Sequence, residues 1–279
     1  MSRIVIAFLC VTSVATLASA AEPKPLDRKT AEENLKKAKE VAEKSESGLT
    51  WLSNALWVAG KKSDSAAIKD VKSKFDRALA GPVKDLNKGL DEVQKAVGAK
   101  DDKEASKLSG GLRDKLKLLK PDEQAEELVK LAKKVRELPI GLVSEKVDDK
   151  FVVSADLLVT KPKEAEGRFK DYLAAVQANA TRMKAIQEQL DDAAEVAGKA
   201  GKLFLSLADR LGKVAPHAGP FKDALTGECL SVGKLANAYN GLSADAKTMA
   251  KEAKRAAEVE QRRHDNLKAS LKTYFGFSL

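Results

Sequence analysis

The chain has 279 residues, 43% of them hydrophobic, and a formal net charge of +9 at pH 7. This length is sufficient to bury a core without covalent cross-links. Aromatic residues make up only 5% of the chain, which argues against nucleic-acid binding through stacked bases, whereas the basic charge favours anionic partners.

The first twenty residues predict a signal peptide. Arg3 is followed by an apolar run over 4–11 and then by the small residues Ala18, Ser19 and Ala20. A basic start, an apolar centre and an A-x-A site are typical of secretory signals, whereas a membrane span needs about 18 or more apolar residues. We expect cleavage after Ala20 and export of the mature chain, which would be secreted, cell-surface associated or periplasmic.

Cleavage at this site would also decide the cysteine chemistry. It would remove Cys10 and leave Cys229 as the only thiol, so the mature chain would have no internal disulfide and would be held together by packing. Cys229 lies between Leu225 and Val232 in a helical pattern. We expect a small residue near the core, and the alternative is a thiol that pairs with a second chain.

Residues 21–138 are expected to form an N-terminal helical bundle region. Residues 30–59 keep a heptad of apolar and small residues after a capping box that begins at Thr30, which predicts a first helix of about 30 residues. Helical spacing then continues over 63–98, where Gly81-Pro82 predicts a kink or break.

Two shorter helical patterns complete this region. The first covers residues 102–119, and the second covers 121–138 with Pro121 in its first turn. Residues 139–162 are a connecting segment, in which 140–160 fit either a helix or short strands. The helical neighbours favour a helix.

Residues 163–275 carry the strongest pattern in the chain. An apolar stripe with alternating steps of three and four residues runs from Phe169 to Val214, about 50 residues or roughly 75 Å of helix. A second stripe runs from Leu225 to Tyr274 after the proline-containing loop 215–220. Two long helices joined by a short loop must lie antiparallel. The predicted fold is all-α, an elongated antiparallel helical bundle with a long coiled-coil hairpin.

The plan of this hairpin resembles that of several exported helical proteins, including surface-coat and receptor ectodomains of trypanosomes and helical pore-forming toxins. The resemblance is one of architecture and covers residues 163–275. No motif at a particular position carries it, so it implies a fold and no function.

Asn179 interrupts the first stripe of the hairpin. Asn179-Ala180-Thr181 is also an acceptor pattern for N-linked glycan, but a glycan cannot fit against a partner helix. A single polar residue at a core position fixes helix register at some cost in stability. The sequence therefore predicts that Asn179 is a buried, register-setting core residue, and that Asn179→Leu would raise thermal stability.

No catalytic, cofactor-binding or metal-binding motif occurs in the sequence. CxxC, HExxH, GxGxxG and phosphate-loop patterns are absent, and the only histidines, His217 and His264, stand about 47 residues apart. Nothing in the sequence places either beside Cys229 as a nucleophile and base would require. We expect a protein that is not an enzyme and that holds no cofactor.

The basic end of the second hairpin helix is the remaining functional clue. Acidic residues are interleaved there, which is typical of a solvated face with ion pairs along the helix. We expect a non-enzymatic protein acting in binding, surface interaction or structure, with an unknown protein, an anionic glycan or an anionic membrane surface as partner. The alternative is a membrane-active amphipathic protein of the lipid-binding or pore-forming type. The mature chain has no predicted transmembrane segment. The candidate binding residues are Lys251, Lys254, Arg255, Arg262, Arg263 and Lys268.

Overall fold

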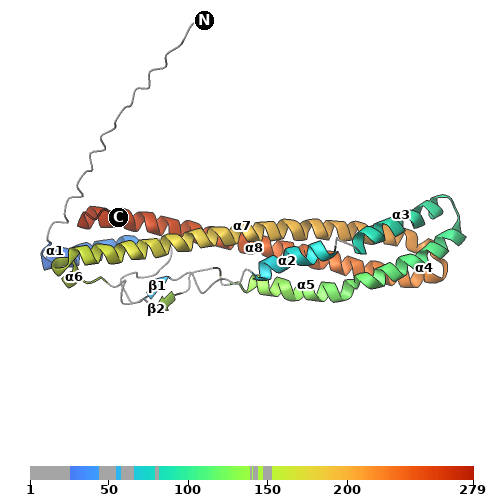
Figure 1. Cartoon of the computed structure of the whole chain (residues 1–279), viewed down its shortest axis with the longest axis horizontal. Coiled ribbons are helices and arrows are strands. Elements are labelled where there is room, and N and C mark those ends of the chain that lie inside the picture. The colour runs from blue at the N-terminus through green and yellow to red at the C-terminus, as the bar shows by residue number, and fades with distance from the viewer. Residues whose placement is uncertain are drawn as a thin grey trace, which may run out of the picture.

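The structure, a computed structural model, is an elongated bundle of helices around one long hairpin (Figure 1). It describes residues 26–43, 55–57, 66–78, 82–138, 140, 144–146 and 153–279. The predicted all-α class and long antiparallel hairpin are confirmed. The predicted signal peptide, residues 1–20, lies outside the described residues.

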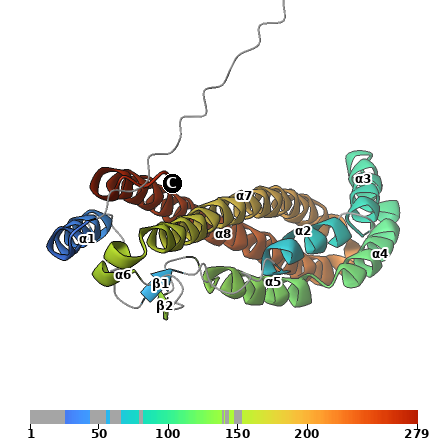
Figure 2. The ribbon, with the colours of Figure 1, turned by 60° about the vertical axis from the view of Figure 1, so that its left-hand side comes forward.

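The hairpin consists of α7 (Pro162–Val214) and α8 (Lys222–Phe275). Two single-turn 3-10 helices, η3 (Ala215–His217) and η4 (Gly219–Phe221), reverse the chain at its tip. The two long helices lie side by side over their whole length in both views (Figures 1 and 2). Their bounds follow from the apolar stripes, which stop at the proline-rich loop.

Four helices cover the half of the hairpin next to the tip: α2 (Ala66–Ala78), α3 (Lys84–Gly98), α4 (Asp102–Leu119) and α5 (Pro121–Arg136). Helix α2 packs on α7 and α5, α5 packs on α8, and α3 packs on α4 and α7 (Figure 1). The separate helices α2 and α3 lie on the two sides of the break expected at 81–82.

The bounds of α4 and α5 follow from local signals in the sequence. The Asp101 side chain accepts a hydrogen bond from the Glu104 backbone N–H at 3.0 Å, which caps the start of α4. Pro121 occupies the first turn of α5, where its missing N–H leaves no helical bond unmade. Between the two helices Lys120 has a φ of 50°, so the turn is tight and the helices follow each other closely.

The opposite end of the hairpin is covered by α1 (Arg28–Glu43) and α6 (Ala155–Thr160). Helix α1 packs on both α8 and α6. The Asn34 side-chain amide donates to the Tyr274 carbonyl oxygen at 2.8 Å, which joins α1 to the last turn of α8. Ser154 caps α6 by accepting from the Leu157 backbone N–H at 3.2 Å.

The helix predicted over 30–59 was wrong, and the helix predicted over 140–160 is observed only in part. The helix expected over 30–59 ends at Glu43, and β1 (Ala55–Trp57) is instead a strand that pairs antiparallel with β2 (Ser144–Lys146). Among the described residues of 140–160, Ser144–Lys146 forms β2 and Ala155–Thr160 forms α6, so the expected helix is observed in α6 and replaced by a strand at β2. Leu56 of the expected heptad lies in β1, where the backbone pairs with a segment about 90 residues away, a contact that spacing along a helix does not reveal. Residues 44–54 and 58–59 of the expected helix lie outside the described residues.

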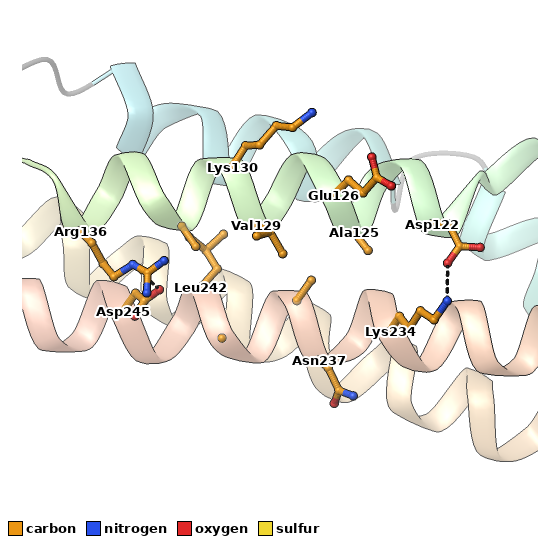
Figure 3. A pocket seen from close by; sticks show the side chains of 13 residues that line it. Asp122, Ala125, Glu126, Val129, Lys130, Arg136, Lys234, Asn237, Leu242 and Asp245 are labelled. Atoms are coloured by element: carbon orange, nitrogen blue, oxygen red, sulfur yellow. Dashed lines mark hydrogen bonds and ion pairs between the residues drawn. The ribbon is translucent and has the colours of Figure 1, made fainter.

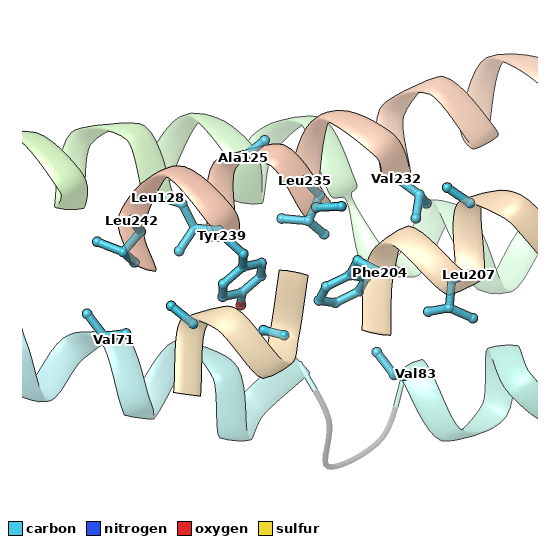
Figure 4. Close-up of a cluster of buried hydrophobic side chains, with 14 of the residues drawn as sticks. Val71, Val83, Ala125, Leu128, Phe204, Leu207, Val232, Leu235, Tyr239 and Leu242 are labelled. Carbon is cyan, nitrogen blue, oxygen red and sulfur yellow. The ribbon is translucent and has the colours of Figure 1, made fainter. Parts of the chain in front are cut away.

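The hydrophobic core is divided into two clusters along the hairpin. The tip core gathers side chains from α2 to α5 around the stacked rings of Phe204 and Tyr239, whose centroids are 5.5 Å apart (Figure 4). The second core, at the α1 end, centres on Phe169, Phe275 and Phe277, with ring centroids 5.5 to 6.1 Å apart. Each end of the hairpin is therefore packed on a separate hydrophobic core.

Candidate functional surfaces

A polar layer lies inside the hairpin between the two cores. Asn179 on α7 is 5% exposed, and Glu260 and Arg263 on α8 are 1% and 0% exposed. None of the three belongs to either apolar cluster. The predicted burial of Asn179 is therefore observed, and its packing against α8 leaves no space for a glycan.

Hydrogen bonds and a ring contact link the members of this layer. Arg263 Nη1 donates to Glu260 Oε1 at 3.4 Å, and Asn179 hydrogen-bonds to the same carboxylate. The Arg263 guanidinium carbon lies 5.9 Å from the centroid of the Tyr172 ring, a cation–π arrangement. These contacts join α7 to α8, and they can form only when the two helices are in one register.

Burial is the largest cause of the pKa shifts in the polar layer. It raises the pKa of Glu260, against the opposing effects of the Arg263 charge and of the hydrogen bonds from Arg263 and Asn179. Burial also raises the pKa of Tyr172 to about 12. Among the described residues, Glu260 Oε2 and the Nε and Nη2 of Arg263 have no hydrogen-bond partner. We therefore expect the layer to cost stability, as a polar feature that fixes register does.

The buried position of Arg263 corrects one of the predicted binding residues. Arg263 was expected on an exposed basic face, but its side chain is fully enclosed. The sequence contained a signal: the α8 stripe has a gap between Ala256 and Leu267. Steps of four, three and four residues across that gap fall on Glu260 and Arg263, the same reasoning that placed Asn179 in the core.

The other five predicted cations are exposed on α8. Lys251, Arg255 and Arg262 share one side of the helix, four and seven residues apart, and Lys254 and Lys268 lie on the adjoining side. None of the five lies within ion-pair distance of a described carboxylate, and of the pairing expected along this helix the structure shows only a longer-range attraction between Lys268 and Asp265. We call these five residues the basic face.

A groove between α5 and α8 lies near the tip half of the molecule (Figure 3). Its volume is about 780 Å³, and small residues line it, including Ala125, Ala132, Ala238 and Gly241. Val129, 58% exposed, extends from α5 into the space between the helices (Figure 3). The sequence did not predict this groove.

Ion pairs join the two walls at both ends of the groove. Lys234 Nζ lies 3.3 Å from Asp122 Oδ1 at one end, and Arg136 Nε lies 3.5 Å from Asp245 Oδ2 at the other (Figure 3). Residue numbers rise together along both walls, so α5 and α8 run parallel here. The central part of the groove is left open and largely apolar.

The residues with catalytic potential are dispersed. His217 Nδ1 lies 3.8 Å from Asp102 at the tip, whereas the Cys229 thiol donates to the Ala208 carbonyl at 3.1 Å. His264 hydrogen-bonds to its neighbour Asp265. The described residues contain no group of three or more potential metal ligands. No helix within the described ranges is long and apolar enough to cross a bilayer.

Neither protein-family models, nor curated proteins, nor solved structures give a match to this chain.

Proposed function

We propose that the protein is an exported, non-enzymatic helical binding protein whose basic face contacts a polyanionic surface. The observation that carries this proposal is the exposure of five cations without an ion-pair partner among the described residues. An anionic partner would therefore not have to displace an internal carboxylate. Each Lys or Arg close to an anionic membrane surface contributes about 1 kcal/mol of binding free energy.

The shape of α8 suits contact with repeated anionic groups. The five cations extend from Lys251 to Lys268, about 25 Å along a continuous helix at 1.5 Å per residue. Between Lys247 and Lys272 the helix has eight Lys or Arg and four Asp or Glu, a net charge of +4. The sulfate or carboxylate groups of a glycan and the phosphates of lipid headgroups share the chemistry that this face would recognise.

The test removes charge from the basic face and compares a matched control. The first variant combines Lys251→Gln, Arg255→Gln and Arg262→Gln. The control removes three exposed charges elsewhere, through Lys88→Gln, Lys103→Gln and Lys117→Gln, each of which is exposed.

Both variants and the wild type are applied to immobilised heparin and to vesicles containing anionic lipid. The basic-face variant should elute at lower salt than the control on the matrix that resembles the natural partner. Equal losses in the two variants would show that only overall charge matters and would overturn the proposal. Retention on heparin alone, or on vesicles alone, distinguishes the glycan from the lipid source.

Membrane activity is the second candidate function. The observation that favours it is the exposure of large leucines: Leu118 is 77%, Leu230 66% and Leu205 54% exposed. A protein that inserts should float with vesicles at high salt, where purely electrostatic contact is screened, and should release an entrapped dye. Flotation that salt abolishes, without dye release, would instead support contact through the basic face alone.

A further inference from the structure

We propose that the α5–α8 groove is an interface between two copies of this chain related by a two-fold axis. The proposal goes beyond anionic binding and does not depend on it, because the basic face lies on a different part of α8. It rests on three observations: the charge pattern of α5, the apolar floor of the groove and the neutral lining of its walls.

An exposed stripe of α5 that borders the groove has a charge pattern that is complementary to its own reverse. Asp122, Glu126, Val129, Lys133 and Arg136 follow one another in steps of four, three, four and three residues, and all five are exposed. Such spacing places them in one stripe along the helix. The stripe is acidic before Val129 and basic after it.

A two-fold axis through Val129 would set two antiparallel α5 helices against each other. Residues 122 and 136 each lie seven positions from Val129, and residues 126 and 133 lie three and four positions away. Glu126 of one copy would thus face Lys133 of the second copy, and the Asp122–Lys234 ion pair of one copy would face the Arg136–Asp245 ion pair of the other. In an isologous contact each of these pairs occurs twice.

The groove supplies the apolar part of the contact. Val129 is 58% exposed at the centre of the stripe, and the space beside it is lined by alanine and glycine (Figure 3). Small residues allow the side chain of a second copy to approach closely. The protruding valine and the receiving floor belong to the same face, as a two-fold contact requires.

The charge of the groove favours a second copy over an anionic partner. Its ionisable lining residues are Asp122, Glu126 and Asp245 against Lys130, Arg136 and Lys234, three of each sign. The chain as a whole has a net charge of +9, but the charges that line the groove balance. The groove therefore has no net positive potential that would attract a polyanion. It is suited to a surface with the same alternating charges.

The experiment is a charge exchange on the full chain, with the dissociation constant measured by sedimentation velocity. The wild type should form a concentration-dependent dimer. Glu126→Lys alone, or Lys133→Glu alone, places like charges opposite each other twice and should weaken the dimer about tenfold or more.

Mixing the two single variants gives the decisive result. In a mixed dimer, one copy presents lysine at both positions and the other presents glutamate at both, so both cross-pairs are attractive again. The double variant Glu126→Lys/Lys133→Glu should also regain the dimer, since its stripe is reversed but still self-complementary. Neither result is expected if these residues bind a different protein.

Matched controls are Glu188→Lys and Lys251→Glu, which reverse exposed charges outside the groove and should leave the dimer unchanged. Helical circular dichroism verifies that each variant is folded. A wild type that stays monomeric at every concentration overturns the proposal, as does a dimer that is insensitive to both single variants, or a mixture that stays dissociated. Retention on heparin or vesicles is measured separately, so failure here leaves the proposed binding function intact.

Discussion

Arg263 supplies the positive charge of the polar layer. Its guanidinium is fully enclosed and lies 3.4 Å from Glu260 Oε1. Replacing Arg263 with Met leaves the buried carboxylate without its cation, and the free energy of unfolding should fall by about 3–5 kcal/mol. Urea denaturation measures the change. Arg262→Met, at the exposed neighbouring position, is the control and should change little; equal losses would place Arg263 outside the core.

Removing the whole layer should have the opposite effect. The sequence alone predicts that Asn179→Leu stabilises the hairpin, but Asn179 hydrogen-bonds to buried Glu260, so the single substitution should lower the melting temperature. The combination Asn179→Leu, Glu260→Leu and Arg263→Met exchanges all buried polar groups for apolar contact and should raise stability by about 1–4 kcal/mol. A triple variant less stable than the wild type would show that the layer stabilises the fold.

The titration of Glu260 gives a pH dependence with a definite sign. Burial raises its pKa above the ordinary value of 4.5, so the folded protein binds this proton more tightly than the unfolded chain. Ionisation therefore destabilises the fold above the raised pKa, and stability is recovered as the pH falls towards 4.5. Compared with Glu260→Gln, the wild type should gain unfolding free energy over that window. A relative loss on acidification, in matched urea titrations, would contradict the raised pKa.

At the scale of elements, helices with a strong stripe and clear end signals were predictable. Helices α4, α5, α7 and α8 each combine regular apolar spacing with a cap, a proline or a tight loop at an end. The prediction over 30–59 was wrong, and the helix predicted over 140–160, where the spacing was ambiguous, is observed only in α6. There the pairing of β1 with β2 depends on segments about 90 residues apart, which local pattern does not reveal.

The candidate surfaces were predictable to different extents. The exposed cations of α8 follow from charge and helical spacing, and the burial of Arg263 follows from completing the stripe. The α5–α8 groove exists because of the distance between α5 and α8, two helices that are far apart in the sequence. That distance depends on side chains between them, such as Ala125 and Ala238. Sequence spacing gives the face of each helix but not that separation.

The tip of the hairpin depends on one glycine. Gly219 has a φ of 53°, and an added Cβ would lie 2.7 Å from Ser106 Oγ on α4. Gly219→Ala should destabilise the protein by about 1–2 kcal/mol from the backbone alone, with a further cost from the contact. Gly276→Ala is the control, since Gly276 also has a positive φ of 69° but no neighbour within 4 Å. Calorimetry should show a larger fall in melting temperature for Gly219→Ala than for Gly276→Ala.

At the scale of the whole molecule, the division of the core has consequences for how the protein opens. The tip core draws on α2 to α5, whereas the core at the α1 end draws on α1, α6 and the chain end. The two meet at a layer of incompletely hydrogen-bonded polar groups. Apolar contact is therefore not continuous along the hairpin, and the two ends can lose packing separately.

Hydrogen exchange with mass spectrometry tests this separation. Phe169→Ala removes a ring that contacts Phe275 and Phe277, and Phe204→Ala removes the ring stacked on Tyr239. Each should cost about 3–5 kcal/mol. Because the polar layer interrupts the core, Phe169→Ala should speed exchange in α1, α6 and the adjoining ends of α7 and α8, while the tip half stays protected. Phe204→Ala should give the converse pattern. A uniform rise in exchange along α7 in either variant would mean that the hairpin opens as one cooperative unit, and that the polar layer fixes register without dividing the fold.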